Sequence, residues 1–105
     1  MTAYAVAHMR SVTPHPEIGL YLDRISDTLD PFGGRFLVHD SVLDVVEGTW
    51  PGHLIVIEFP DLAAARDWYA SPAYREIARY RTDHTDSDIV FTAGVADGYR
   101  ASSQH

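Results

Sequence analysis

Four ionisable residues have the types and spacing that acid–base chemistry needs: Arg35, His39, Glu47 and Glu58. Arg35 and His39 lie four residues apart in an alternating stretch, so we expect a strand that points both side chains to one face. Glu58 interrupts an apolar run, and a buried carboxylate needs a partner such as the guanidinium of Arg35. The functional interpretation is a polar cluster with His39 and Glu58 as catalytic residues, His39 serving as general base near neutral pH. Arg35 and Glu47 would then bind the substrate. The structural alternative is an ion pair that fixes strand register or a dimer.

A second candidate group is aromatic and surrounds a predicted helix break at Ser71-Pro72. Trp68, Tyr69 and Tyr74 can form the walls of a substrate-binding pocket for a flat apolar molecule, with a tyrosine hydroxyl supplying polarity. The alternative is that these rings serve core and interface packing. The sequence is compatible with both interpretations.

Sequence motifs for a metal or cofactor are missing. The chain has no cysteine, and its six histidines show no local metal-ligand spacing. It has no glycine-rich phosphate loop and no nucleophile-elbow serine. Asp83, Asp86 and Asp88 lack the glycine and the terminal glutamate of a calcium loop, which favours a solvated acidic turn. We therefore predict neither a metal nor a cofactor.

The composition and charge of the chain indicate which partners and which cell compartment to expect. Eight Lys+Arg against 15 Asp+Glu give a net charge of −7, which should repel nucleic-acid phosphates. No apolar run approaches the roughly 20 residues that span a bilayer, and the start of the chain lacks a signal-peptide pattern, so we expect a cytoplasmic protein that binds no membrane. The 105 residues suit one domain over residues 1–96, followed by a small polar tail over 97–105.

Periodicity and turn residues divide the chain into alternating elements. An apolar stripe of Ile18, Leu22, Ile25 and Leu29 predicts a helix capped by Thr13. A second helix begins at Asp61 and breaks at Ser71-Pro72. The extended segments, with a hairpin turn at 48–52 and a loop at 82–88, are 3–9, 35–41, 42–47, 54–59 and 89–95.

The resulting β-α-β-β-α-β order predicts an α+β domain of the ferredoxin-like type, an antiparallel sheet with both helices on one face. The other face stays uncovered, yet Leu54 to Phe59 offers apolar side chains to both faces. A monomer would expose too large an apolar patch, which predicts a homodimer with the two sheets packed face to face.

Four segments in order resemble the bacterial family known as domain of unknown function 1330: residues 33–38 (GGRFLV), 47–51 (EGTWP), 55–60 (IVIEFP) and 64–74 (AARDWYASPAY). The resemblance implies a dimeric α+β barrel of ferredoxin-like protomers and no established reaction. The chain departs from the family pattern at Asp40-Ser41, where glycine is more usual, in the polar loop 82–88, and in the tail.

Three functions follow as hypotheses. The first is a small dimeric protein that binds a small apolar or aromatic molecule. The second, by analogy of fold alone, is a cofactor-independent enzyme, monooxygenase-like or isomerase-like, that uses a histidine or carboxylate in the barrel. The third is a structural or interaction module. A cavity touching His39, Arg35, Glu58 or Trp68 would favour the first two.

Overall fold

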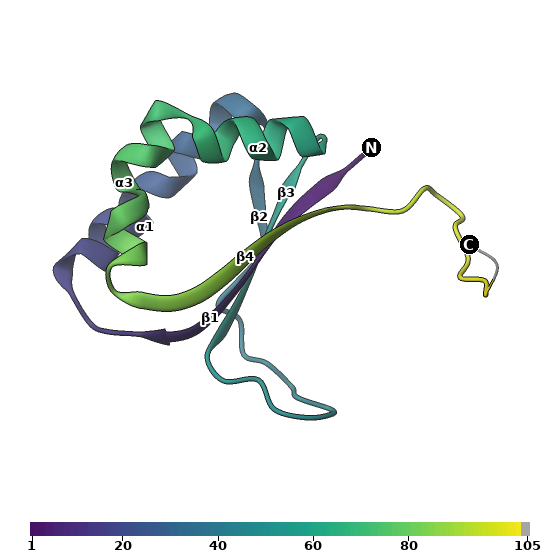
Figure 1. Ribbon diagram of the computed structural model, residues 1–105, viewed down its shortest axis with the longest axis horizontal. Helices are drawn as coiled ribbons and strands as arrows, with labels where there is room; N and C mark the ends of the chain where they lie inside the picture. Colours follow the sequence, from purple (N-terminus) through teal and green to yellow (C-terminus); the bar gives the residue numbers. More distant parts are fainter. Residues whose placement is uncertain (104–105) are drawn as a thin grey trace.

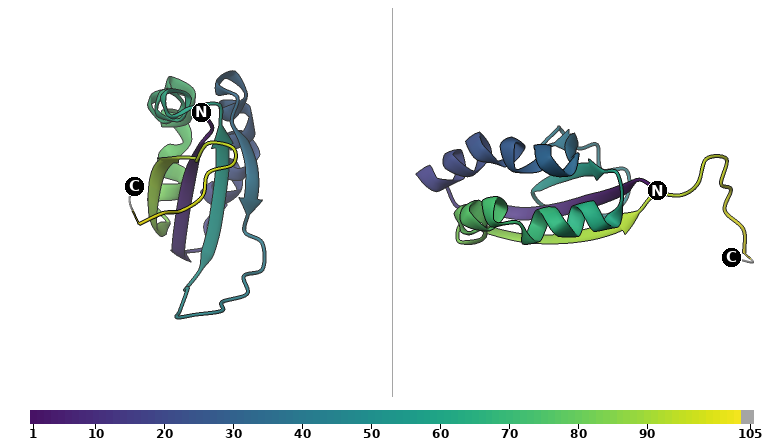
Figure 2. Two further views of the ribbon diagram at one scale, coloured as in Figure 1. Left: turned by 90° about the vertical axis from the view of Figure 1, so that its right-hand side faces the viewer. Right: turned by 90° about the horizontal axis from the view of Figure 1, so that it is seen from above.

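Four antiparallel strands form one sheet, and all the helices cover the same face of it (Figures 1 and 2). The computed structural model describes residues 1–103. Strand order is β2-β3-β1-β4, which confirms the predicted ferredoxin-like α+β fold. The elements in chain order are β1 (Ala3–Val12), α1 (Pro16–Leu29), the short 3-10 helix η1 (Asp30–Phe32), β2 (Arg35–His39), β3 (His53–Phe59), α2 (Leu62–Ala70), α3 (Pro72–Thr82) and β4 (Thr85–Ala93).

Local capping decides where the helices begin. The predicted cap Thr13 is wrong for α1, because the Glu17 N–H donates to Nδ1 of His15 at 3.1 Å and the helix starts at Pro16. Asp61 caps α2 as predicted, accepting from the N–H of Ala64 at 2.8 Å. Ser71 ends α2 and caps α3, which confirms the break before Pro72.

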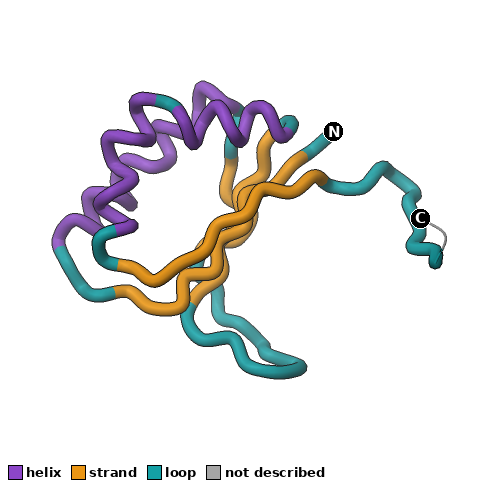
Figure 3. Tube along the Cα trace, in the orientation of Figure 1, coloured by secondary structure: helices purple, strands orange, loops and turns teal. Residues whose placement is uncertain are grey.

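The structure contradicts the predictions for two segments, residues 42–47 and residues 82–88. Residues 42–47 form no strand and belong to a long loop, residues 40–52, that extends away from the sheet (Figure 3). Val42 and Val46 in this loop are almost fully exposed, so no burial holds them in an extended pairing. The polar segment 82–88 pairs with β1 from Thr85 onward instead of forming a loop. Arg10 on β1 makes this possible, since its guanidinium binds the carboxylates of Asp86 and Asp88 at 2.7 and 2.6 Å.

An irregularity in β2 changes which side chains share a face. Arg35 pairs with Glu58 and Phe36 with Ile57, but the register then shifts so that His39 pairs with Ile55. Leu37 is the extra residue of this β-bulge. Arg35 therefore lies on the face away from the helices, and His39 lies on the face toward them. The prediction that both point to one face is wrong.

The two sides of the sheet differ in burial. Toward the helices lies the core, whose largest fully buried side chains are Trp68, Tyr74, Phe59, Leu29 and Ile77. The opposite side, here called the outer face, carries Tyr4, Val6, His8, Leu54, Val56, Glu58, Val90 and Thr92. Its side chains from β3 are only half-buried, and Val90 is 57% exposed. The prediction that β3 presents apolar residues on both faces is confirmed.

Beyond β4, residues 94–103 leave the sheet without regular structure (Figure 1). The end of the predicted tail, residues 104–105, lies outside the described residues. Within residues 1–103, no helix combines the length and the apolar character needed to cross a membrane.

Candidate functional site

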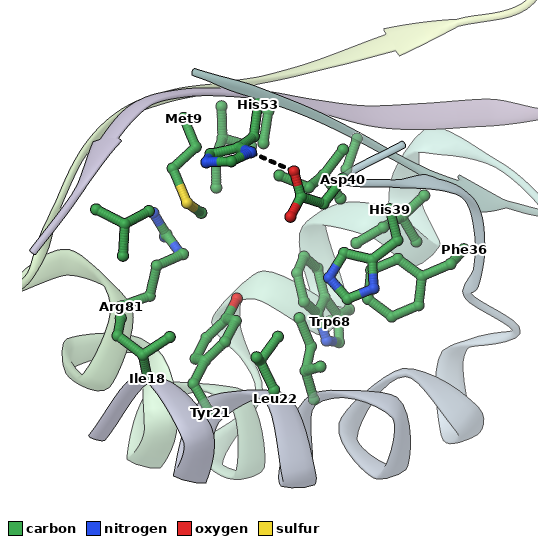
Figure 4. A pocket seen from close by; sticks show the side chains of 17 residues that line it. Met9, Ile18, Tyr21, Leu22, Phe36, His39, Asp40, His53, Trp68 and Arg81 are labelled. Carbon is green, nitrogen blue, oxygen red and sulfur yellow. Dashed lines mark hydrogen bonds and ion pairs between the residues drawn. The ribbon is translucent and has the colours of Figure 1, made fainter. Parts of the chain in front are cut away.

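A cavity of about 490 Å³ lies between the sheet and the helices (Figure 4). Its volume is in the range of small-molecule sites, which run from about 300 to 1,000 Å³. Polar groups are few among its lining, and the apolar lining residues are Ala5, Ala7, Met9, Val12, Ile18, Leu22, Ile25, Phe36, Ile55, Ile57, Trp68 and Ile89.

The cavity exists because β1 presents small side chains to the helices. Ala5 and Ala7 line the cavity, and each places only a methyl group on the face of β1 that is turned toward the helices. Protein interiors are normally packed with few voids larger than a water molecule. A space of this size, bounded by helices and strands, is therefore unusual for a protein interior and large enough for a ligand.

Three ionisable side chains gather at the exposed rim of the cavity. Asp40 follows β2 in a left-handed conformation with φ of 59°, and its N–H donates to the carbonyl of Leu54 at 3.2 Å. This geometry brings the Asp40 carboxylate onto Nδ1 of His53, the first residue of β3. His39 lies beside them, stacked on Phe36 with ring centroids 4.5 Å apart. A carboxylate on Nδ1 favours the histidine tautomer whose Nε2 can accept a proton.

A second polar group lies at the buried end of the cavity. The Arg81 side chain is only 6% exposed, and its Nη1 donates to the hydroxyl of Ser87 at 2.8 Å. Its Nη2 donates to the hydroxyl of Tyr74 at 3.4 Å, and the hydroxyls of Tyr74 and Tyr21 are 2.8 Å apart. Burial, the largest cause, raises the pKa of Tyr21 well above its usual range. Tyr21 therefore stays a protonated hydrogen-bond donor.

The predicted aromatic group is divided by the structure. Trp68 lines the cavity, and its Nε1–H donates to the hydroxyl of Thr28 at 3.0 Å. Tyr69 and Tyr74 pack on Trp68, with ring centroids 6.1 and 4.2 Å away, but neither lines the cavity. For these two tyrosines the packing interpretation describes what the structure shows.

The predicted polar cluster is divided as well. The ion pair between Arg35 and Glu58 is confirmed, with Nε and Oε1 2.9 Å apart, but it lies on the outer face. His39 lines the cavity on the opposite side of the sheet. Glu47 is exposed in loop 40–52 and borders a separate hollow of about 230 Å³ beside Trp50. These four residues therefore do not form one cluster within a protomer.

Sequence reasoning missed four polar residues of the cavity: Tyr21, Asp40, His53 and Arg81. Arg81 had a signal, because it follows Ile77 by four residues and Tyr74 by seven, the spacing of one helix face. The sequence holds no signal for the pairing of Asp40 with His53, since this pairing depends on how loop 40–52 returns to the sheet.

One group among the described residues has a donor set suited to a metal ion. One nitrogen each of His15 and His84 and one carboxylate oxygen of Glu17 lie within 4.8 Å of one another. Two imidazoles and a carboxylate suit zinc and similar transition metals. The two rings stack at 3.9 Å, and Nε2 of His84 lies 2.8 Å from Oε1 of Glu17. The hydrogen bond to His84 lowers the pKa of Glu17.

The family model for a domain of unknown function, DUF1330, matches residues 2–95, nearly the whole folded part of the chain. The chain belongs to the DUF1330 family. The resemblance seen in the sequence is thereby confirmed. No curated protein matches the chain significantly.

Solved structures share the fold at low sequence identity. RPA0582, a protein of unknown function from Rhodopseudomonas palustris, has a TM-score of 0.69 at 17% identity over 90% of this chain and 83% of that one. A dimeric ferredoxin-like protein of unknown function from Jannaschia sp. has a TM-score of 0.62 at 9% identity, covering 90% and 100% of the two chains. An asparagine-to-alanine mutant of SnoaB, a cofactor-independent oxygenase from Streptomyces nogalater, has a TM-score of 0.61 at 18% identity, covering 93% of this chain and 98% of that one. These likenesses establish the fold.

Proposed function

We propose that this DUF1330 protein binds a small, largely apolar aromatic molecule in the cavity between the sheet and the helices. The observation that carries the proposal is the cavity itself, with its volume of about 490 Å³ and mostly apolar lining. Trp68 supplies an aromatic wall, and the polar groups sit at two ends, where they can orient a ligand.

Filling the cavity tests this proposal. A7L places a larger side chain in the cavity, and A63L makes the same change at an exposed position of α2. The probes are 2-naphthol and indole, and the readout is the rise in melting temperature when each probe is added. We expect both probes to stabilise the wild type and A63L but not A7L. Equal stabilisation of A7L, or none of the wild type, would refute cavity binding.

We also propose that a second copy of the chain covers the outer face. This surface is covered by no helix of residues 1–103, and it carries the apolar groups of Tyr4, Val6, Leu54, Val56 and Val90. Two structures of this fold are described as dimeric, which supports self-association. The test is V90D, which puts a charge at a half-exposed valine of this face. We expect light scattering to show a dimer for the wild type and a monomer for V90D at equal concentration. A wild-type monomer would refute this arrangement.

A second candidate function is cofactor-independent acid–base catalysis on the same ligand. The observation in its favour is the contact of Asp40 with His53 at the rim of the cavity, next to His39. His53, oriented by the carboxylate, can take a proton from an acidic C–H of a bound molecule at Nε2. The candidate partner Glu58 lies on the outer face, so Asp40 replaces it in this proposal.

Hydrogen exchange measures this chemistry directly. The probe is 2-tetralone, an aromatic ketone with acidic C–H groups, in D2O, and NMR follows the loss of its C1 protons. We expect wild-type protein to accelerate the exchange over buffer and H53Q to remove the acceleration. H39A tests whether the neighbouring imidazole shares the role. Acceleration that persists in both variants would exclude these histidines as the base.

A further inference from the structure

The buried end of the cavity holds a positive charge without a negative partner. Arg81 is the one charged side chain among residues 1–103 that is buried, and no carboxylate of this part of the chain lies within 4.0 Å of it. Its Nε is buried and has no hydrogen-bond partner. Burying an unpaired charge is costly, and an arginine in a protein keeps its charge. The structure thus contains an unsatisfied cation on the wall of a ligand-sized cavity.

Tyr21 adds a second donor at the same place. A guanidinium can only donate, so the hydroxyl oxygen of Tyr74 accepts from Arg81, and in its 2.8 Å contact with the hydroxyl of Tyr21 either oxygen can be the donor. When Tyr74 is the donor, the hydroxyl proton of Tyr21 is available to an acceptor in the cavity. Tyr21 lines the cavity, and Figure 4 shows its oxygen pointing inward between Arg81 and Leu22.

The charge of Arg81 is opposite in sign to that of the chain as a whole, which carries a net charge of −7. The other groups that tie down Arg81 are neutral hydroxyls, those of Ser87 and Tyr74, and the ring of Tyr21, whose centroid is 5.9 Å from the guanidinium carbon. These groups accept some of the hydrogen bonds that Arg81 can donate, but none of them carries a negative charge. An anionic oxygen in the cavity beside the guanidinium would balance its charge.

We propose that the ligand of this cavity is an aromatic carboxylate whose anionic group is held by Arg81 and Tyr21. This rests on the binding function proposed above. The apolar walls contact the aromatic body, and the carboxylate lies at the buried end. The opposite end of the ligand then faces the rim, where His39, Asp40 and His53 lie. Charge-assisted hydrogen bonds are about twice as strong as neutral ones, so the charge should govern the choice of ligand.

A pair of probes with one shape separates this inference from the binding function. They are 2-naphthoate and 2-naphthamide, measured by isothermal titration calorimetry at pH 7.5. We expect wild-type protein to bind naphthoate at least about tenfold more tightly, as charged hydrogen bonds of roughly 1.5 kcal/mol or more require. R81M should remove this preference while still binding the amide. R79M, two residues away on the same helix at an exposed position, should keep it.

A spectroscopic readout on the wild type keeps the test independent of whether R81M folds. The Nε–H of Arg81 has no hydrogen-bond partner within residues 1–103, so its NMR resonance should shift when naphthoate binds beside the guanidinium and shift less with naphthamide. Equal affinity for the two probes, a preference that survives in R81M, or an Arg81 resonance that ignores naphthoate would overturn the inference and leave cavity binding intact. Failure of both probes, together with 2-naphthol and indole, would overturn both proposals.

Discussion

The hydroxyl of Tyr74 is the centre of the buried hydrogen-bond network, which makes Y74F a sharp perturbation. Tyr74 is 0% exposed, and its oxygen contacts both the hydroxyl of Tyr21 and Nη2 of Arg81. Removing it leaves two buried polar groups without this partner. Removing the hydroxyl of Tyr21 instead leaves Tyr74 still bonded to Arg81.

The magnitudes follow from what each variant leaves unpaired. A buried polar group without its partner costs about 1–3 kcal/mol. Arg81 keeps its bond to Ser87, and its bond to Tyr74 is long at 3.4 Å, so this half of the loss belongs at the low end of that range. We therefore expect Y74F to lower the free energy of unfolding by about 2–3 kcal/mol and Y21F by about 1 kcal/mol.

Equilibrium unfolding in urea measures both values, with the protein concentration held constant because self-association would shift the midpoint. Y80F is the matched control, since within residues 1–103 the ring of Tyr80 contacts Arg79 and its hydroxyl makes no hydrogen bond. It should change stability by less than about 0.5 kcal/mol. If Y21F proves as destabilising as Y74F, or Y74F resembles Y80F, Tyr74 is not the centre of the network.

Two further predictions concern the contact between Glu17 and His84 and the glycines of loop 40–52. His84 lowers the pKa of Glu17, so this contact stabilises the fold above the ordinary pKa of about 4.5 and is lost as pH falls through the lowered value. The stability difference between wild type and E17Q should then be present at pH 6 and vanish near pH 2, as measured by urea unfolding. In loop 40–52, a Cβ on Gly52 would lie 2.0 Å from the carbonyl oxygen of Met9, whereas one on Gly48 meets nothing within 4 Å. Both have positive φ, so thermal melts should show G48A mildly destabilised and G52A far more; equal melting temperatures would contradict the steric reasoning.

Local signals in the sequence predicted most of the fold. Apolar periodicity gave the helices, Pro72 gave the break between α2 and α3, and Glu58 inside an apolar strand pointed to its ion pair with Arg35. Each of these depends on neighbours in sequence or on one dominant partner. For the same reason the predicted helix cap at Asp61 is confirmed, because its side chain bonds to the N–H of Ala64, three residues further along the chain.

The site was harder to predict because it depends on pairing between distant segments. Strict alternation places His39 with Arg35, and the bulge at Leu37 reverses that assignment. A bulge is set by how β2 aligns with β3, which no local pattern encodes. Likewise, Asp40 contacts His53 only because loop 40–52 brings the chain back to the sheet beside the end of β2.

The cavity and the outer face are linked by the strands they share. On β1, Ala5 and Ala7 border the cavity, and Val6 between them lies on the outer face. A sheet with an unfilled space on one side has fewer contacts to hold its strands, so covering the other side should make the cavity walls more rigid. By linkage, a probe that fits the cavity should then bind the dimer more tightly than the monomer, and should in turn strengthen the dimer. We expect 2-naphthol to bind V90D more weakly than wild type, with far-UV circular dichroism confirming that V90D is folded. Identical affinities would show that the two faces of the sheet act independently.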